Sequence, residues 1–403
     1  MAHVEDRWFR PGPDGAKTGT SRHGTGLRWR VRYLDPGGAE RSKSFARKPD
    51  AERFMNAAAA KVQDGTWSDP ALGKVTLRRY VEQTYLPAQV TEPTTRQTIE
   101  LRFRLHVLPA LGDHTLSQLA AEPSVIRSWA AGLAGQMAPG HVRTIFANLS
   151  GAMSAAVPDG KISRNPCALV KPPKADRSRV VPWEAEQAAA VRAALPARYQ
   201  ALADCGAGLA MRQGEVFGLA VDDTDFLRRV VHVRRQVRMV DARLVFAPPK
   251  GGRERDVPLP ESVSLSLAAH IAQFPPVAVT LPWKVPGGKP VTARLIFTSR
   301  ERAALNRNYV NSYLWKPALE KAGVLAAREN GFHALRHYFA SACLHNGADI
   351  RALAEYLGHH DPGFTLRTYV HLMPDAGDRM RAAVDRMLGG EADGPATARG
   401  ARR

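Results

Sequence analysis

The stretch that decides the fold runs from residue 333 to residue 369 and holds three short motifs: His333-Ala-Leu-Arg336-His337, Leu357-Gly358-His359 and Tyr369. Imidazoles, a guanidinium and a phenol recur here at spacings that suit short helices. His333 and Arg336 are three residues apart, so on a helix they share one face. The opposite face is apolar, and we expect it to be buried through Leu335, Phe339, Ala342 and Cys343.

A second helix is predicted over residues 350–357. Apolar residues recur there at helical spacing: Ile350, Leu353, Ala354 and Leu357. Asp349 can cap the N-terminus, and Gly358 stands where a helix end favours a left-handed residue, so His359 should lie just past that end. Asp361-Pro362 predicts the start of a third helix, with Tyr369 on it or directly after it.

The composition points to a polyanionic partner. The chain has 403 residues, 44% of them hydrophobic, and a net charge of +19. This length predicts two or three domains, and this charge favours nucleic acid. A genome rich in G and C is an alternative source of arginine, but it explains the excess over acidic residues less well.

The cysteines and the apolar runs indicate a protein of the reducing cytoplasm. Cys167, Cys205 and Cys343 are far apart and form no C-x-x-C pair, so neither a disulfide framework nor a zinc site is predicted. The N-terminus lacks the apolar core of a signal peptide, and no run reaches about 18 apolar residues, so we expect no membrane span.

Residues 1–70 predict a small sheet backed by one helix. The first 24 residues are rich in Gly and Pro, and we expect an irregular start. Arg28, Arg30 and Arg32 then alternate with apolar residues, which indicates a half-buried strand with a basic face. That face can enter a DNA groove or face solvent, and the alternation alone favours neither. A turn at 36–38, a strand over 40–45 and a helix over 49–62 follow.

Residues 74–170 predict a helical domain. We expect helices starting at 75 and over 95–107, 122–133 and 139–157, with a break at 109–112. The expected core residues are Tyr80, Leu101, Leu105, Trp129, Ile145, Phe146 and Leu149. The segment from Lys171 to Lys174 holds two prolines, so it is an extended linker whose lysines can follow a phosphate backbone.

Residues 178–390 predict one larger domain of mixed α and β structure. Helices are expected over 183–194, 197–210, 306–321 and most of 333–372, and strands over 229–238, 243–247 and 255–259. A Pro-Lys-Gly-Gly turn that contains Lys250 joins the last two strands. The tail 391–403 is small and polar, and we expect it to be disordered.

The candidate groups fit the cleavage of a phosphodiester by a protein nucleophile. The sequence has no aspartate cluster for magnesium and no phosphate-binding glycine loop, so we expect neither a metal nor a nucleotide cofactor. Tyr369 is the candidate nucleophile, and its phenol, with a pKa of about 10, needs help to lose its proton. His333 can take that proton or return it.

Fixed positive charge can stabilise the same reaction. Arg212 and Arg336 can each hold two phosphate oxygens through a planar fork. His359 can donate a further hydrogen bond, and Lys250 can protonate the leaving 5′-oxygen. Taken singly, each of these residues is more often structural. We expect His337, Tyr338 and His371 to be structural, and His359-His360 lacks a third ligand for zinc.

Together the motifs resemble the active site of the tyrosine recombinases, the phage integrase family. Residues 210–215, Ala-Met-Arg-Gln-Gly-Glu, look like the family's first arginine box, with Glu215 as the acidic support. Ala-Met replaces the usual Gly-Leu before Arg212. Lys250 lies in the turn where the family keeps its lysine, and His333, Arg336, His359 and Tyr369 match the remaining boxes in the family's order.

The resemblance implies a multidomain, mainly α protein with small β-sheets. An arm-type DNA-binding domain would span 1–70, a four-helix core-binding domain 74–170, and an α+β catalytic domain 178–390. The implied function is site-specific recombination through a 3′-phosphotyrosine, integrating or excising a phage or mobile element. The implied partners are double-stranded DNA at core and arm sites, three further copies of the chain, and an excisionase or DNA-bending protein, all at the nucleoid.

Two rival functions share part of this pattern. A type IB topoisomerase shares the chemistry as a monomer, but the basic strand and the linker argue against it. A DNA-binding protein that keeps the fold without catalysis is the other, and the complete set of six motif residues argues against that.

Overall fold

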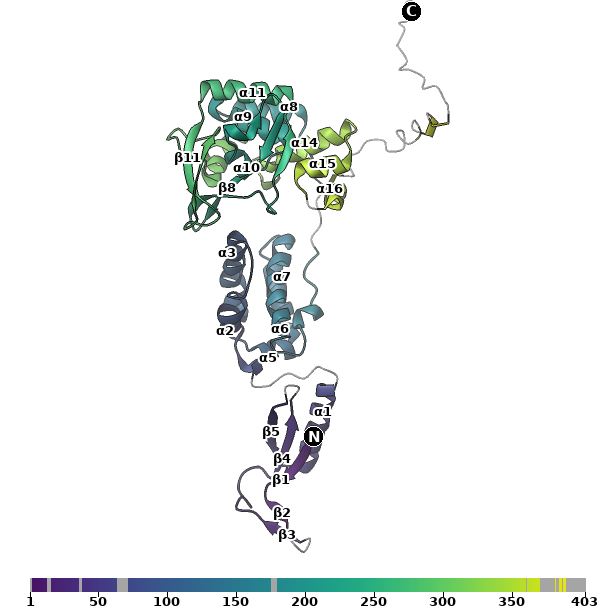
Figure 1. Cartoon of the computed structure of the whole chain (residues 1–403). Helices are drawn as coiled ribbons and strands as arrows, with labels where there is room; N and C mark the ends of the chain where they lie inside the picture. The colour runs from purple at the N-terminus through teal and green to yellow at the C-terminus, as the bar shows by residue number, and fades with distance from the viewer. Residues whose placement is uncertain are drawn as a thin grey trace, which may run out of the picture. The chain divides into compact units, whose positions relative to one another are not determined.

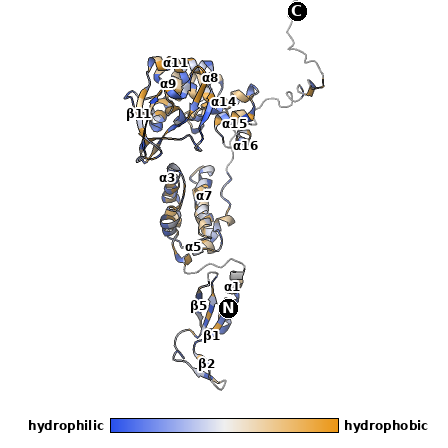
Figure 2. Cartoon of the chain, in the orientation of Figure 1, coloured by the Kyte–Doolittle hydropathy of each residue, from blue (hydrophilic) through white to orange (hydrophobic). Residues whose placement is uncertain are grey.

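The computed structural model describes residues 2–12, 16–35, 38–63, 72–174, 180–359 and 361–369, with a few positions between 381 and 388. The chain divides into two compact units, Met1–Arg177 and Ser178–Arg403, and is rich in helix with small antiparallel sheets (Figure 1). Hydrophobic residues are spread through both units (Figure 2), and no helix among the described residues is long and apolar enough to cross a membrane. The expected disordered tail lies outside the described residues.

A three-stranded antiparallel sheet in the order β1-β4-β5 opens the first unit. Its strands are β1 (His3–Asp6), β4 (Trp29–Leu34) and β5 (Glu40–Phe45), and helix α1 (Lys48–Gln63) follows. Val31 and Tyr33 of β4 are buried with Ala51 and Ala58 of α1. The two predicted strands and the helix are confirmed, while Pro36 and Gly37 of the predicted turn lie outside the described residues.

The prediction of an irregular start was wrong. Besides β1, the strands β2 (Phe9–Pro11) and β3 (Lys17–Gly19) form a hairpin. β1 pairs with β4 in a register that sets His3 opposite Arg32. β1 is stabilised by pairing with a strand more than twenty residues away, so the local sequence does not indicate it. The glycines and prolines of this segment indicated an irregular structure instead.

Helices make up the rest of the first unit. They are α2 (Leu77–Tyr80), α3 (Pro93–Arg102), α4 (Leu108–Leu111), α5 (Leu116–Ala121), α6 (Pro123–Ala134) and α7 (Pro139–Ala155), with π-helical turns at Val81–Tyr85 and Phe103–Val107 and short 3₁₀ turns at Leu72–Lys74 and Pro166–Leu169. The helical run ends at Leu111 and not at Pro109. Pro109 lies in the first turn of α4, where the backbone N–H that proline lacks would have no helical partner. The segment 171–174 is neither helix nor strand, as predicted.

Two of the predicted core residues in this unit are wrong. Leu101 and Leu105 are 43% and 54% exposed, whereas Phe103 and Val107 are fully buried. The π-helical turn at Phe103–Val107 widens the helix, so a period of 3.6 residues selects the wrong face. The other predicted core residues pack in or against the cluster that contains Leu149.

The second unit begins with helices α8 (Ala185–Ala194), α9 (Ala197–Leu209) and α10 (Gln213–Phe217) and a 3₁₀ turn at Val221–Asp223. One sheet has the order β10-β7-β6, and two hairpins, β8-β9 and β11-β12, accompany it. The strands are β6 (Thr224–Asp225), β7 (Val230–Val233), β8 (Gln236–Val240), β9 (Arg243–Ala247), β10 (Arg255–Pro258), β11 (Val277–Pro282) and β12 (Pro290–Leu295).

The strand predicted over 229–238 is therefore two strands in different sheets, broken at Arg234-Arg235. Arg235 bonds the buried carboxylate of Asp223, and this contact turns the chain between the two strands. Helix α11 (Glu261–Gln273) and the β11-β12 hairpin were not predicted. The helical run predicted over 306–321 is present as α12 (Arg307–Tyr309), a π-helical segment Val310–Trp315 and α13 (Lys316–Lys321), and a 3₁₀ turn follows at Arg328–Asn330.

Three helices close the described part of this unit: α14 (His333–His345), α15 (Ile350–Leu357) and α16 (Pro362–Tyr369). Asp349 caps α15 by accepting from the amides of Arg351 and Ala352, and Gly358 ends it with φ 60° and ψ 43°. Tyr369 is the last residue of α16. These predictions are confirmed. On α14 the deeply buried apolar residues are Ala334, Leu335, Ala340 and Leu344, while Phe339 and Cys343 are only partly buried.

Candidate active site

Helices α14, α15 and α16 hold the candidate residues around a small apolar cluster. Its buried members come from four helical segments and are Ala210, Ala340, Leu344, Leu353, Leu357 and Tyr369. The cluster packs the end of α9 against the three last helices. It therefore brings the first arginine box, more than a hundred residues upstream, to the motifs of residues 333–369.

Arg212 stands at the N-terminus of α10 with extended backbone dihedrals. Its Nη1 donates to Oε1 of Glu215 at 2.8 Å, and its Nη2 donates to the carbonyls of Leu357 and Gly358 at 3.3 and 3.2 Å. The residue two before it, Ala210, adopts a left-handed conformation with φ 50°. A glycine takes that conformation with less strain, so Ala in place of the family's usual Gly costs backbone energy here.

Glu215 is fully buried between two guanidinium groups. Besides Arg212, Arg255 donates to both of its oxygens, at 3.1 and 2.7 Å. Burial opposes ionisation, but the hydrogen bonds and charge of Arg255 and the charge of Arg212 lower the pKa of Glu215 to about 2. Arg255 also donates from Nε to the carbonyl of Tyr356, so it ties β10 to the end of α15.

Arg336 is 1% exposed. Its Nη1 donates to the carbonyl of Ala210 at 2.5 Å and its Nη2 to the carbonyl of Leu357. Its Nε has no hydrogen-bond partner among the described residues. Burial and the nearby charge of Arg212 lower the pKa of Arg336 to about 9. Both Nη atoms of Arg336, which we predicted to hold phosphate oxygens, thus donate to main-chain carbonyls in the free protein.

Tyr369 is also 1% exposed, and among the described residues its hydroxyl has one polar partner. Tyr369 Oη and His337 Nδ1 are hydrogen-bonded at 2.7 Å. Burial raises the pKa of Tyr369 to about 12, although the charge of Arg336 opposes this. Burial and the charge of Arg336 lower the pKa of His337 to about 4, so both groups are neutral near pH 7.

His333 and His359 flank the two arginines. The ring of His333 lies edge-on to that of His337, with centroids 4.8 Å apart, and His359 Nδ1 is 2.7 Å from Oγ1 of Thr365. Burial and the surrounding cations lower the pKa of His333 to about 4 and that of His359 to about 3. Both imidazoles are therefore neutral near pH 7 in the free protein.

Lys250 lies in the turn between β9 and β10 and is exposed. Gly251 and Gly252 follow with positive φ, and the amide of Gly252 donates to the carbonyl of Pro249 at 2.8 Å. The ammonium of Lys250 adds a small contribution to the lowered pKa of His333, after burial and the charges of His337, Arg336 and Arg212. The predicted turn is confirmed.

The candidate DNA contacts belong to the first unit. Arg28 donates to both oxygens of Asp6, Arg32 bonds Glu5 and Glu40 at 3.0 and 2.7 Å, and Arg30 is 4.0 Å from Glu5. Carboxylates of β1 and β5 thus face Arg28, directly before β4, and Arg30 and Arg32 of β4. Lys171 and Lys174 are exposed in the irregular segment that follows the helices.

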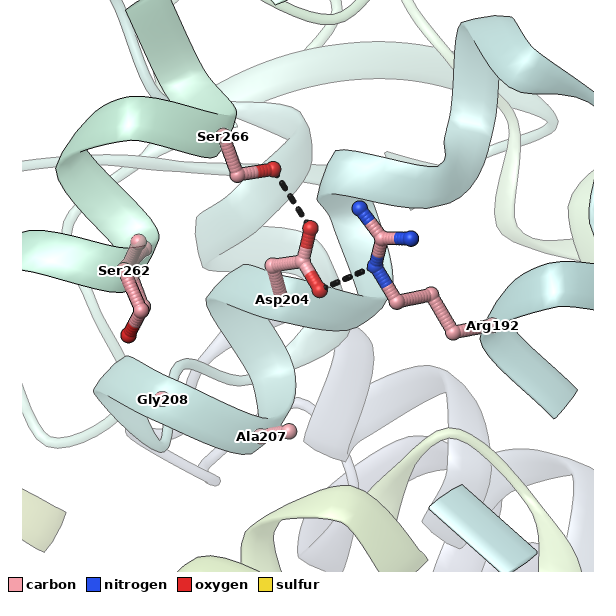
Figure 3. A pocket seen from close by; sticks show the side chains of 7 residues that line it. Arg192, Asp204, Ala207, Gly208, Ser262 and Ser266 are labelled. Atoms are coloured by element: carbon pink, nitrogen blue, oxygen red, sulfur yellow. Dashed lines mark hydrogen bonds and ion pairs between the residues drawn. The ribbon is translucent and has the colours of Figure 1, made fainter. Parts of the chain in front are cut away.

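No cluster of three metal-binding side chains occurs among the described residues. A separate pocket lies between α8, α9 and α11, where Asp204 accepts hydrogen bonds from Arg192 and Ser266 (Figure 3). The carboxylate of Asp204 is satisfied there by its own neighbours. Residues 210–215 and 333–369 do not line this pocket, so it is distinct from the candidate active site.

Comparison with known proteins decides the family. Residues 179–375 match the model of the phage integrase family. The chain belongs to this family. A putative prophage phiRv2 integrase of Mycobacterium tuberculosis is 26% identical over 364 residues, which are 88% of this chain and 92% of that protein. The tyrosine recombinase XerC of Mycobacterium bovis is 28% identical over 290 residues, covering 68% and 86%. The protein is a tyrosine-type site-specific recombinase.

Solved structures of the family share the fold. The Tn1549 transposon integrase in complex with transposon right end DNA matches with a TM-score of 0.64 and 20% identity, over 78% of this chain and 100% of that one. A lambda integrase tetramer bound to a Holliday junction matches with a TM-score of 0.55 and 18% identity, over 82% and 93%. The helix-rich integrase fold predicted for the chain is confirmed.

Sequence reasoning missed two residues that the structure places in the site. His337 was expected to be structural, although its position four residues after His333 already set both rings on one helical face. Arg255 was seen only as the start of a strand. No sequence signal marks it, because its partner Glu215 lies forty residues away and pairs with it only through the fold.

Proposed function

We propose that Tyr369 attacks a DNA phosphodiester and forms a 3′-phosphotyrosine while a 5′-hydroxyl leaves. The observation that carries this is the convergence of Arg212 and Arg336 on the carbonyl of Leu357, in the same buried cluster as Tyr369. Two guanidinium groups beside one phenol suit a reaction in which negative charge develops on phosphate oxygens. The covalent link keeps the phosphodiester energy, so a second 5′-hydroxyl can reverse the step without a nucleotide.

Each remaining residue has a proposed role. Arg212, Arg336 and His359 bind the non-bridging oxygens, with Glu215 fixing Arg212 from behind. Lys250, on the exposed turn, protonates the leaving 5′-oxygen, and His333 assists proton transfer. No metal ion takes part, so cleavage is expected to proceed in EDTA.

The test is covalent trapping on a suicide substrate, a nicked duplex from which the 5′-hydroxyl strand diffuses away. Wild-type protein is expected to form a protein–DNA adduct that denaturing gels resolve. Tyr369→Phe is expected to bind the same DNA and to form no adduct. Adduct formation at the wild-type rate by Tyr369→Phe contradicts the assignment of the nucleophile.

We further propose that the partner is double-stranded DNA and that four copies of the chain exchange strands between two duplexes. The net charge of +19 and the complexes of the Tn1549 and lambda integrases with DNA support this. Residues 1–70 would bind arm sites through Arg28, Arg30 and Arg32. Residues 74–170 would be a core-binding domain, followed by a linker whose Lys171 and Lys174 contact DNA, and 178–390 would be the catalytic domain.

The biological setting is proposed from the relatives alone. A chain alike over most of its length to a prophage integrase would integrate or excise a phage or mobile element. This reaction would take place at the nucleoid in the cytoplasm, with an excisionase or a DNA-bending protein setting its direction. Assembly on paired attachment sites, measured as four protomers per synapse, tests the stoichiometry.

A further inference from the structure

The hydroxyl of Tyr369 is bonded to an imidazole that the motif reading did not use. His337 lies on α14, one turn after His333, and its Nδ1 is 2.7 Å from Tyr369 Oη. The pair bridges α14 and α16 beside the apolar cluster of Leu353 and Leu357. A buried phenol and a neutral imidazole at this distance form a defined proton path.

We propose that His337 is a catalytic residue that holds the hydroxyl of Tyr369 and accepts its proton as the oxygen attacks phosphorus. This rests on the proposed function, since it takes Tyr369 as the nucleophile. His337 would thus remove the proton of Tyr369, a role that the sequence motifs predicted for His333.

The geometry separates the two histidines. Among the described residues, His333 makes no hydrogen bond to Tyr369, and its ring meets His337 edge-on at 4.8 Å. A base must lie within about 2.6–3.2 Å of the oxygen whose proton it takes, or reach it through one water. His337 meets this condition in the free protein.

The charges around His337 explain how a weak base can serve. The titratable groups that face it are His333 and Arg336 on its own helix and Tyr369 on α16. Burial and the cation of Arg336 lower the pKa of His337 and keep the imidazole neutral, so its lone pair is available. A phosphodiester brings negative charge to the arginines and offsets that cation, which makes the imidazole more basic at the stage where it is needed.

The step balances without another reactant. The O–H bond of Tyr369 breaks and its proton passes to Nδ1 of His337, while an oxygen lone pair forms the bond to phosphorus. The bond from phosphorus to the 5′-oxygen breaks, and that oxygen takes a proton from Lys250. In the resealing direction Nδ1–H returns its proton to the departing phenolate. His337 must therefore start as the tautomer protonated at Nε2.

Two substitutions at position 337 distinguish proton transfer from positioning. His337→Asn places an amide near the position of Nδ1, where it can still hold the hydroxyl but cannot take the proton. His337→Phe keeps a ring and does neither. Both are expected to cleave a suicide substrate roughly 10²-fold more slowly than wild type. His333→Asn, the same change one turn earlier, is the matched control.

Replacing Tyr369 with a difluorotyrosine, whose phenol is more acidic, supplies the decisive readout. It is expected to restore most of the cleavage rate of His337→Asn, because a more acidic phenol needs less help from a base. It is expected to restore His333→Asn much less. Wild-type rates for His337→Asn, or equal restoration in both backgrounds, overturn the proposal. Adducts from Tyr369→Phe would instead overturn the proposed function, so the two failures are distinguishable.

A measurement on the wild-type chain covers the case in which the variants fail to fold. Nitrogen NMR of the histidine rings is expected to show one imidazole, shifted by Tyr369→Phe, that is protonated at Nε2 and unprotonated at Nδ1. The opposite tautomer, with Nδ1–H donating to the phenol, leaves no lone pair for the proton and overturns the proposal.

Discussion

Arg212 and Arg336 donate to the same main-chain oxygen, the carbonyl of Leu357. Two cations are thereby held side by side at the end of α15, and their mutual repulsion is offset by this carbonyl and by the carboxylate of Glu215. His359 directly follows Leu357 and Gly358, so the hydrogen bonds from the arginines to these carbonyls also fix the position of His359. Loss of either arginine therefore disturbs the turn as well as the phosphate site.

Removing either arginine is expected to reduce cleavage strongly. Arg212→Ala and Arg336→Ala should lower the cleavage rate by roughly 10³-fold or more, by analogy with arginines that stabilise phosphoryl transfer. Arg→Lys should recover little, because an ammonium cannot reach a carbonyl and a phosphate oxygen in one plane. The single-turnover rate on the suicide substrate is the measurement. A lysine variant at near wild-type rate would show that the charge alone suffices.

Lys250→Ala is expected to respond to the chemistry of the leaving group. If Lys250 protonates the 5′-oxygen, its loss slows cleavage only while that oxygen leaves poorly. A substrate with a bridging 5′-sulfur leaves without protonation, so it should restore cleavage to Lys250→Ala and not to Arg212→Ala. Without that rescue the general acid must be sought elsewhere, first at His333 or Lys284.

Gly358→Ala tests the turn itself. Gly358 has φ 60°, and an added Cβ would lie 3.2 Å from Cδ of Arg255. The left-handed backbone alone should cost about 1 kcal/mol of stability. Gly323→Ala is a matched control, since Gly323 has φ 71° with open space around it. Both variants should melt at a lower temperature, while only Gly358→Ala should also lose cleavage rate. Equal rates in the two would remove the link between this turn and catalysis.

Changing Arg28, Arg30 and Arg32 together to Ala is expected to weaken binding to arm sites and to spare cleavage at a core suicide site. Each lost phosphate contact lowers the salt slope by at most about 0.9. The decrease per arginine should be smaller here, because the carboxylates that face these arginines take up cations once they are released. Binding assays over a salt series measure both effects. An equal loss of binding affinity at core and arm sites would show that these arginines do not contact the arm sites specifically.

The sequence predicted the parts of the site that local signals encode. Asp349 and Gly358 bound a helix whose apolar spacing is plain, and the structure has α15 there. The contacts that set the chemistry are not local. Arg336 reaches the carbonyl of Ala210 across 126 positions, and His337 meets Tyr369 only after α14 and α16 pack together. Spacing identifies such residues as candidates but cannot tell which imidazole will face the phenol.

The misplaced helical core has a comparable cause. The period that selected Leu101 and Leu105 assumes a regular helix, and the π-helical turn at Phe103–Val107 changes the period within the element. Strand β1 was not predicted from the sequence, because it is stabilised by pairing with β4. The first error thus comes from an irregularity inside a helix, and the second from pairing between distant strands.

The ion pairs of Arg28, directly before β4, and of Arg30 and Arg32 within it have a consequence for target choice. An arginine that already has a carboxylate partner gains little from a loosely held phosphate, because one ion pair is exchanged for another. It gains only where the DNA offers contacts better aligned than those of Glu5, Asp6 or Glu40. The strand would then discriminate between DNA sites more than it raises the affinity for duplex DNA in general.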